Sequence, residues 1–279
     1  MKDYIDAAAF KEMILCADAA LHQNINAIND LNVFPVPDGD TGTNMGLTIN
    51  NAAQELRKKS FDTISAAADC VAGAMLRGAR GNSGVILSLL FRGISKRLKG
   101  LDTAGAAEFI GAMNDGVAAA YKAVMKPAEG TILTVSRLAS QAAAKAVDEA
   151  ADLEASLQEA IRSGELALAD TINQNPVLKK AGVIDAGGKG YMIILRAMLD
   201  SLQGKIRKWQ HGCIRKGPCG IVRAKRRPVV VRAQIYVFFI MIIQRRYDIN
   251  AFYAGYHMRR YFLVNQFEIC GVIHVIRRA

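Results

Sequence analysis

Two aspartates separated by a single glycine, Asp38 and Asp40, have the residue type and spacing to bind one hard cation. They follow an apolar segment that Pro35 and Pro37 keep out of a helix or an inner strand. With Gly39 as a hinge, both carboxylates can turn toward the same point. Magnesium takes oxygen ligands and usually shares them between one or two carboxylates and substrate phosphates. The pair predicts a magnesium site in a loop, although an Asp-Gly-Asp alone is equally typical of a solvated turn.

Hydrogen-bond donors follow the two aspartates directly. Thr41, Thr43 and Asn44 form a turn that opens into a predicted helix over residues 45–58. A helix starting near Thr43 would direct its unpaired amide groups at the cation, where phosphate oxygens are favoured. Asn32, or Asp30, could complete the metal site from the end of the preceding helix.

A second glycine-rich segment, residues 78–84, precedes another predicted helix. Glycine lets a backbone approach an anion closely, and Asn82 and Ser83 beside Gly81 add side-chain donors. Alone, this segment is more typical of a turn between helices. Next to the aspartate loop, it favours phosphate binding.

Two further helix starts have the same character. Thr131 follows Gly130 and can bound a nucleotide or simply cap its helix. Asp185 and Gly187 precede the last predicted helix of the body and would place small residues beside a base or ribose.

Together these segments resemble the DAK2 (DhaL-like) nucleotide-binding domain, in the version carried by the ATP-binding subunit of bacterial fatty acid kinase. The resemblance covers roughly residues 1–204 and rests on four ordered motifs, which are residues 32–46, 78–84, 129–133 and 181–188. It implies an eight-helix barrel that holds Mg2+ and ATP or ADP at one end. It also implies Asp38 and Asp40 as catalytic metal ligands. Some members of the family use a further acidic ligand earlier in the chain, a place that Asn32 or Asp30 could take here.

The resemblance implies a kinase that transfers the γ-phosphoryl group of Mg-ATP to the carboxylate of a fatty acid, which a separate lipid-binding carrier protein presents. A carboxylate is already an ionised nucleophile, so a general base is not required. One alternative is the nucleotide subunit of a dihydroxyacetone kinase, against which Thr41 argues because that branch tends to have histidine there. Another is a non-catalytic nucleotide-binding fragment. A homodimer is a further possible assembly.

The body itself reads as an all-α domain. Eight segments of apolar residues at helical spacing, rich in alanine, predict an amphipathic bundle or barrel. The first is predicted over residues 7–30 without a break, and Asp62 is predicted to cap the third. The N-terminus lacks an apolar signal core, which favours a cytoplasmic protein.

Charge divides the chain at residue 204. Residues 205–279 contain 16 Lys and Arg against 2 Asp and Glu, whereas residues 1–204 contain 20 against 23. The net charge of +11 therefore comes from the tail, and no nucleic-acid partner is expected for the body.

The irregular basic tail has three interpretations. Its arginines and 11 aromatic residues suit nucleic-acid binding. Its apolar run at 235–243 could lie on an anionic membrane, but it is too short for a transmembrane segment, which needs about 20 residues. We favour the third interpretation, an out-of-frame translation that follows a complete domain.

Overall fold

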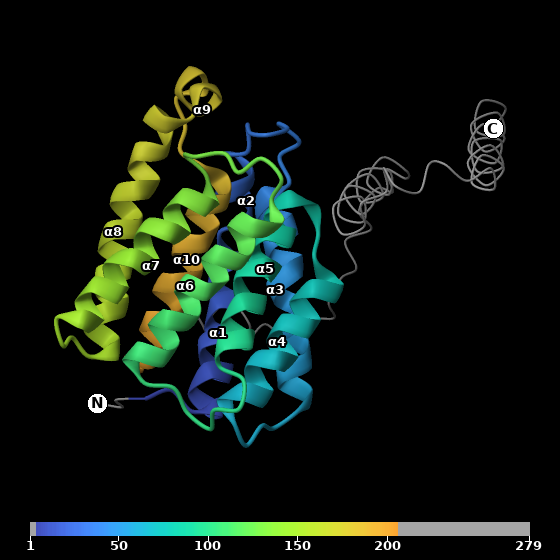
Figure 1. Ribbon diagram of the computed structural model, residues 1–279. Helices are drawn as coiled ribbons and strands as arrows, with labels where there is room; N and C mark the ends of the chain where they lie inside the picture. Colours follow the sequence, from blue (N-terminus) through green and yellow to red (C-terminus); the bar gives the residue numbers. More distant parts are fainter. Residues whose placement is uncertain (1–3, 206–279) are drawn as a thin grey trace, which may run out of the picture. The chain divides into compact units, whose positions relative to one another are not determined.

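The computed structural model describes residues 4–205, and the structural statements below refer to that part of the chain (Figure 1). These residues lie within a single compact unit. The interpretations of the basic tail concern residues 205–279 and lie almost entirely outside the described residues.

The described part is helical throughout. Among residues 4–205, the β-type pairing is an isolated antiparallel bridge between Ile5 and Ala104, so the predicted all-α class is confirmed. In chain order the helices are α1 (Ala7–Gln23), α2 (Ile25–Asn29), α3 (Thr41–Lys58), α4 (Ile64–Gly78), α5 (Gly81–Arg97), α6 (Ala106–Ala123), α7 (Ile132–Asp148), α8 (Leu153–Gln174), α9 (Pro176–Ala181) and α10 (Ala186–Leu202).

Within residues 4–205, eight long helices form a closed ring in which neighbours run antiparallel (Figure 1). The order around the ring is α1, α3, α4, α5, α6, α7, α8 and α10, and α10 packs against α1 to close it. The short helices α2 and α9 extend the ends of α1 and α8. The predicted eight-helix barrel is confirmed, and its alternating order places the starts of α3, α5, α7 and α10 at one end.

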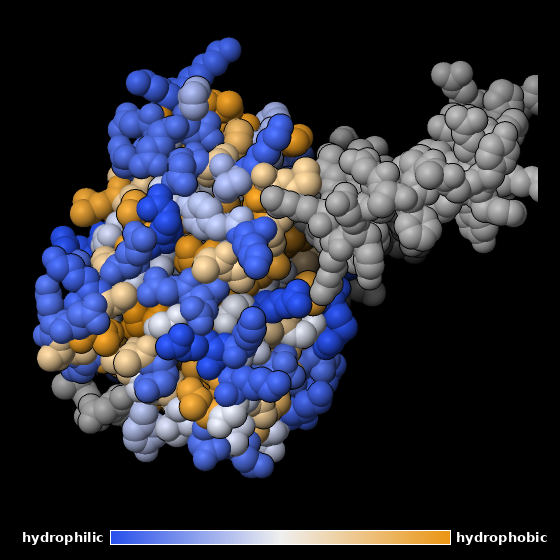
Figure 2. All heavy atoms as spheres, in the orientation of Figure 1, coloured by the Kyte–Doolittle hydropathy of each residue, from blue (hydrophilic) through white to orange (hydrophobic). Residues whose placement is uncertain are grey.

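Small residues let the helices approach closely, and large apolar ones fill the space between them. A single cluster of buried apolar side chains includes residues from all eight long helices. Phe10 of α1 and Phe109 of α6 meet edge to face there, with ring centroids 6.4 Å apart. Figure 2 shows polar residues over much of the visible face of the described part, with apolar residues between them. This pattern agrees with the amphipathic helices predicted from sequence.

Three predicted boundaries are wrong. The predicted helix over residues 7–30 is divided at Asn24, whose side-chain amide donates to the carbonyl oxygen of Ala20 at 2.8 Å. α3 begins at Thr41 rather than at residue 45. Thr63, not Asp62, caps α4, because its hydroxyl accepts from the backbone N–H of Ala66.

No helix in the described range combines the length and the apolar character that crossing a membrane would require.

Candidate functional site

The residues predicted from sequence to form the site all lie at the end of the ring where α3, α5, α7 and α10 begin. Each of these helices directs its first backbone N–H groups toward that end, which favours anions there. The predicted residues are Asn32, Asp38, Asp40, Thr41, Thr43, Asn44, Gly81, Asn82, Ser83, Thr131, Asp185 and Gly187. By the elements that carry them, they fall into two groups, one around the starts of α3 and α5 and one around the starts of α7 and α10, and direct contacts join some members of each group.

Asn32 organises the loop that carries the aspartates. Its side-chain oxygen accepts hydrogen bonds from the backbone N–H of Thr41, at 2.9 Å, and from the Thr41 hydroxyl. Its amide nitrogen donates to the carbonyl oxygen of Val36 at 2.7 Å. Asn32 is buried, and these bonds fold the loop back onto the start of α3. Its assignment as a metal ligand stays a prediction.

Asp38 and Asp40 lie together at the start of α3, on either side of Gly39. Asp40 occupies the N-cap position, but its side chain makes no capping bond to its own helix. Partial burial raises the pKa of Asp40, and the hydrogen bond and negative charge of Asp38 raise it further, against a hydrogen bond from Asn44 that lowers it. Two carboxylates that interact unfavourably in this way would be relieved by a bound cation.

The aspartates are the acidic ligands that the described residues offer here. Among residues 4–205, no group of three or more His, Cys, Asp or Glu side chains could hold a metal ion. A cation at Asp38 and Asp40 would therefore take its other ligands from neutral oxygens, water or a phosphate. This donor set fits Mg2+, which is often bound through two carboxylates and substrate phosphates.

Asn29 is a residue of this group that the sequence did not reveal. Its side-chain oxygen accepts from the backbone N–H groups of Gly42, at 2.8 Å, and Thr43, at 3.2 Å. Its amide nitrogen donates to the Thr43 hydroxyl at 3.0 Å. Asn29 ends α2 and so caps a helix that begins twelve residues later, which no local pattern indicates. It fixes the Thr43 hydroxyl as an acceptor, whose own proton remains available to a ligand.

The start of α5 packs directly on α3. A Cβ atom at Gly81 would lie 2.4 Å from the Asn44 side-chain nitrogen, and Gly81 has a φ of +56°. The backbone N–H of Arg80 donates to the Thr48 hydroxyl at 3.3 Å. Glycine is therefore needed for the close approach of the two helix starts. Gly81 is thus the residue of α5 that meets Asn44, and Asn82 and Ser83 follow it in the first turn of α5.

Asp185 joins the starts of α7 and α10. Its side chain accepts from the backbone N–H of Gly188 at 2.6 Å and from that of Ile132. Burial raises the pKa of Asp185 to about 6, against the lowering effect of these two bonds. Asp185 is 5 % exposed, so it holds two helix starts together rather than facing solvent. Gly187 packs against Ile132, where a Cβ atom would lie 3.3 Å from the Ile132 Cβ.

Thr131 caps α7 from the other side of this junction. Its hydroxyl accepts from the backbone N–H of Leu133 at 3.4 Å and donates to the carbonyl oxygen of Ala128 at 2.8 Å. The capping role considered for Thr131 is therefore present. Its role in bounding a nucleotide stays a prediction.

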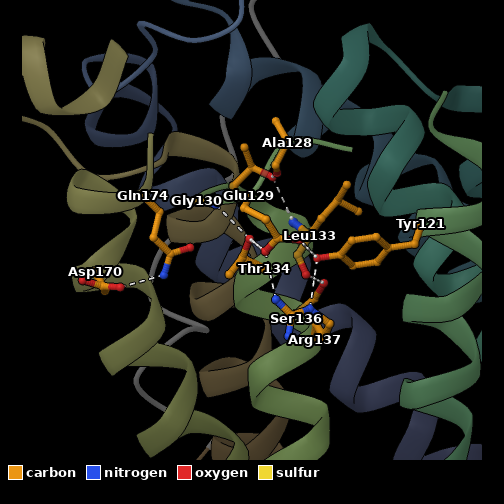
Figure 3. A network of polar contacts seen from close by, with 11 residues as sticks. Tyr121, Ala128, Glu129, Gly130, Leu133, Thr134, Ser136, Arg137, Asp170 and Gln174 are labelled. Carbon is orange, nitrogen blue, oxygen red and sulfur yellow. Dashed lines mark hydrogen bonds and ion pairs between the residues drawn. The ribbon is translucent and has the colours of Figure 1, made fainter. Parts of the chain in front are cut away.

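A polar network beside Thr131 was missed by the sequence analysis (Figure 3). It centres on Glu129, whose carboxylate accepts hydrogen bonds from Tyr121, Thr134 and Arg137. The four residues come from α6, the loop before α7, and α7 itself. Glu129 stands in one of the motifs read from sequence, but its partners lie on two helices and form no recognisable local pattern.

Within the described residues, eight long helices form a closed ring, and the loop that carries Asp38 and Asp40 lies at the end where α3, α5, α7 and α10 begin. This arrangement defines an all-α domain that brings helix starts and carboxylates together at one end. The DAK2 domain model matches residues 35–200, and the chain belongs to this family.

Relatives extend the similarity beyond the family match. The chain is 45% identical over 201 residues to protein YloV of Bacillus subtilis, covering 72% of this chain and 36% of YloV. It is 43% identical over 205 residues to an uncharacterized protein of Staphylococcus saprophyticus, covering 74% of this chain and 37% of that protein. The chain thus spans little more than a third of the length of these relatives.

A solved structure shares the fold. It is the dihydroxyacetone kinase from C. freundii in complex with AMP-PNP and Mg2+, with a TM-score of 0.55 and 17% sequence identity. The similarity covers 72% of this chain and 35% of the kinase. At this identity the match shows a common helical fold, and the DhaL-like class inferred from sequence is confirmed.

Proposed function

We propose that the body of this chain is a Mg-nucleotide-binding kinase domain, which transfers the γ-phosphoryl group of ATP to the carboxylate of a fatty acid held by a separate carrier protein. The observation that carries the nucleotide part is the Asp38 and Asp40 pair at the start of α3, at the same end of the ring as the starts of α5, α7 and α10. The structurally similar dihydroxyacetone kinase, which was crystallised with AMP-PNP and Mg2+, supports the same assignment.

Different residues of this chain would bind the metal, bind the phosphates and shape the site. Asp38 and Asp40 would hold Mg2+, which when bound neutralises phosphate charge and orients the transferring group. Thr43, with its proton available, and Asn44 would donate to phosphate oxygens at the start of α3. Asn82 and Ser83 would donate from the start of α5. Thr131, Asp185 and Gly187 would shape the side of the site formed by α7 and α10.

The transfer itself needs no proton abstraction with this substrate. A carboxylate oxygen would bond to the γ-phosphorus while the bond from that phosphorus to the β,γ-bridging oxygen breaks. ADP leaves with the electron pair, and the product is an acyl phosphate. Positioning and charge neutralisation would supply most of the catalysis, as in other phosphoryl transfers.

Calorimetric titration of the full chain with AMP-PNP, with and without Mg2+, tests the nucleotide part. We expect binding that requires Mg2+ and that weakens at least about tenfold in Asp38→Asn and in Asp40→Asn, because each loses a charged ligand. Asp62→Asn, an exposed aspartate at the opposite end of the ring, is the matched control and should bind as the wild type does. Mg2+-independent binding by a folded chain would refute the proposed site.

The acceptor is tested separately, by ATP turnover with a fatty-acid-loaded carrier protein and with dihydroxyacetone on its own carrier subunit. Turnover with the lipid carrier alone supports the fatty acid assignment. Turnover with dihydroxyacetone would instead favour the alternative kinase, against which Thr41 argues. Nucleotide binding without turnover of either substrate would identify a binding-only module.

A further inference from the structure

The loop between α6 and α7, residues 124–131, is held in place by the carboxylate of Glu129 (Figure 3). Tyr121 of α6 donates to one carboxylate oxygen at 3.0 Å. Arg137 of α7 donates to the other at 2.9 Å and lies over the Tyr121 ring, 5.9 Å from its centroid. The loop is therefore fastened to both of the helices that it connects.

Thr134 connects the Glu129 carboxylate to the backbone of Gly130, which precedes the predicted site residue Thr131. Its hydroxyl donates to Glu129 at 2.7 Å and accepts from the backbone N–H of Gly130 at 2.9 Å. Because the Thr134 hydroxyl has a single proton, its donation to the Glu129 carboxylate leaves the oxygen lone pairs directed at Gly130. Thr134 is 1 % exposed, so water does not compete for these bonds.

Position 130 requires glycine. Its φ is +72°, and a Cβ atom there would lie 2.9 Å from the Gln174 Cβ. The residue therefore combines a left-handed backbone with direct packing on the end of α8. Fixing the direction of its N–H also fixes Thr131, the next residue and the N-cap of α7.

Electrostatics favour the ionised form of Glu129 that this arrangement needs. Partial burial raises the pKa of Glu129, but hydrogen bonds from Thr134, Arg137 and Tyr121 outweigh it and hold the pKa below its usual value. Glu129 is half exposed, so its bonds to Tyr121 and Arg137 are open to solvent. The buried Thr134 hydroxyl, by contrast, connects the Glu129 carboxylate to the backbone of Gly130.

We propose that Glu129 is a positioning residue that acts through Thr134 and Gly130 to set the start of α7 for nucleotide binding. This inference rests on the proposed function and adds to it a residue that does not itself touch the nucleotide. The Glu129 carboxylate determines the backbone geometry of Thr131 through two hydrogen bonds, one from the Thr134 hydroxyl to Glu129 and one from the Gly130 N–H to the Thr134 hydroxyl.

Variants at Thr134 test these two hydrogen bonds in the full-length protein, with Mg-AMP-PNP as the probe. Thr134→Val keeps the side-chain shape but loses both bonds, and we expect its Kd for Mg-AMP-PNP to rise about tenfold. Thr134→Ser keeps the hydroxyl and should restore the Kd to within about twofold of wild type. Glu129→Gln, which loses the charge, should fall between wild type and Thr134→Val.

Glu165→Gln is the matched control, because Glu165 also pairs with an arginine on a neighbouring helix, Arg196 at 2.9 Å, along the middle of α8 and α10. It should leave the Kd unchanged even if it lowers the thermal midpoint as much as Glu129→Gln does. Equal Kd values for Thr134→Val and wild type would overturn the proposal. So would a loss of affinity that Thr134→Ser does not restore.

Amide hydrogen exchange without nucleotide separates this inference from the proposed function. We expect the amides of residues 130–133 to exchange about tenfold faster in Thr134→Val than in wild type, with other helix starts unaffected. Unchanged exchange would overturn the positioning role. A wild-type chain that fails to bind Mg-AMP-PNP would overturn the proposed function, and the exchange data would still decide whether the chain of bonds fixes the loop.

Discussion

Asp185 shows how one carboxyl group can link two helices at a cost in stability. It accepts backbone N–H groups from the starts of α7 and α10, where the partial positive charge of each helix favours an anion. Burial nevertheless raises the pKa of Asp185 to about 6. At neutral pH the ionised group is therefore less well accommodated in the folded chain than in the unfolded one.

Asp185→Asn should therefore change how stability depends on pH. Between pH ~4 and pH ~6 the unfolded chain releases the Asp185 proton while the folded chain keeps it, so this group lowers stability as pH rises. Above pH ~6 the decrease in the free energy of unfolding is complete and amounts to about 3 kcal/mol, since each unit of pKa shift is worth about 1.4 kcal/mol.

Urea unfolding of wild type and Asp185→Asn across this range measures the effect. The stability of the variant relative to wild type should increase between pH ~4 and pH ~6 and stay constant above. Asp152→Asn is the control, because Asp152 caps α8 by a 2.7 Å bond to Ala155 at an exposed position. A difference between wild type and Asp185→Asn that does not vary with pH would contradict the prediction.

At the residue scale, the sequence predicts groups that could do chemistry but not the groups that hold them in place. Asp38, Asp40 and Thr43 were predicted because their types and spacing are unusual. Asn29 was not, because it acts on a helix start twelve residues away. Glu129 was read only as part of a motif, since its partners meet it in space. Supporting residues depend on tertiary contacts, which sequence spacing does not show.

At the element scale, helical periodicity found the eight long helices but not all of their ends. The break at Asn24 lacks glycine or proline, so the apolar pattern continues through it. The short α9 was missed although Pro176 stands at its first position, which is a favourable start. α3 extends through Gly42 because Asn29 and Asn32 cap it from outside, which outweighs the poor helix propensity of its first turn.

The contact between α5 and α6 gives a prediction at this scale. A Cβ atom at Gly116 would lie 2.4 Å from the carbonyl oxygen of Leu90, and one at Gly93 would lie 2.4 Å from the Gly116 Cα. The two backbones touch, so Gly116→Ala must push the helices apart. We expect it to lower the free energy of unfolding by about 2 kcal/mol or more, as overpacked sites do.

Gly111→Ala on the same helix is the control for the Gly116 prediction. A Cβ atom there would meet the flexible end of the Arg97 side chain at 3.4 Å, which can move aside. This change should stabilise the protein by about 0.5–1 kcal/mol, because alanine favours a helix interior more than glycine does. Urea unfolding of both variants measures the difference. Equal effects at the two positions would show that the helices are not in backbone contact.

At the scale of the whole molecule, the body and the tail differ in composition and in their relation to known proteins. The matched family segment, residues 35–200, ends inside α10. The similarity to YloV covers 201 residues, whereas YloV itself is much longer. Charge also changes sign after residue 204. We therefore propose that residues 1–204 form the folded nucleotide-binding domain and that the boundary with the basic tail lies at Gly204.

The end of α10 supports this boundary. Gly204 has a φ of +71°, and its N–H donates to the carbonyl oxygen of Ser201 at 3.0 Å. The N–H of Lys205 donates to the carbonyl oxygen of Asp200 at 2.8 Å. A left-handed glycine followed by a bond of this kind is a common way to end a helix and satisfy its last carbonyl groups. The ring is already closed at this point, because α10 packs against both α1 and α8.

A chain that ends after Lys205 should therefore fold like the full chain. We expect its thermal midpoint to lie within ~2 °C of the full-length value, since the ring and the cap of α10 are retained. Its affinity for Mg-AMP-PNP should be unchanged. A chain that ends after Asp185 is the control and should not fold, because it lacks α10 and leaves the facing sides of α1 and α8 uncovered. If the chain ending at Lys205 were markedly less stable, residues beyond it would contribute to the folded body, and the boundary would lie further along the chain.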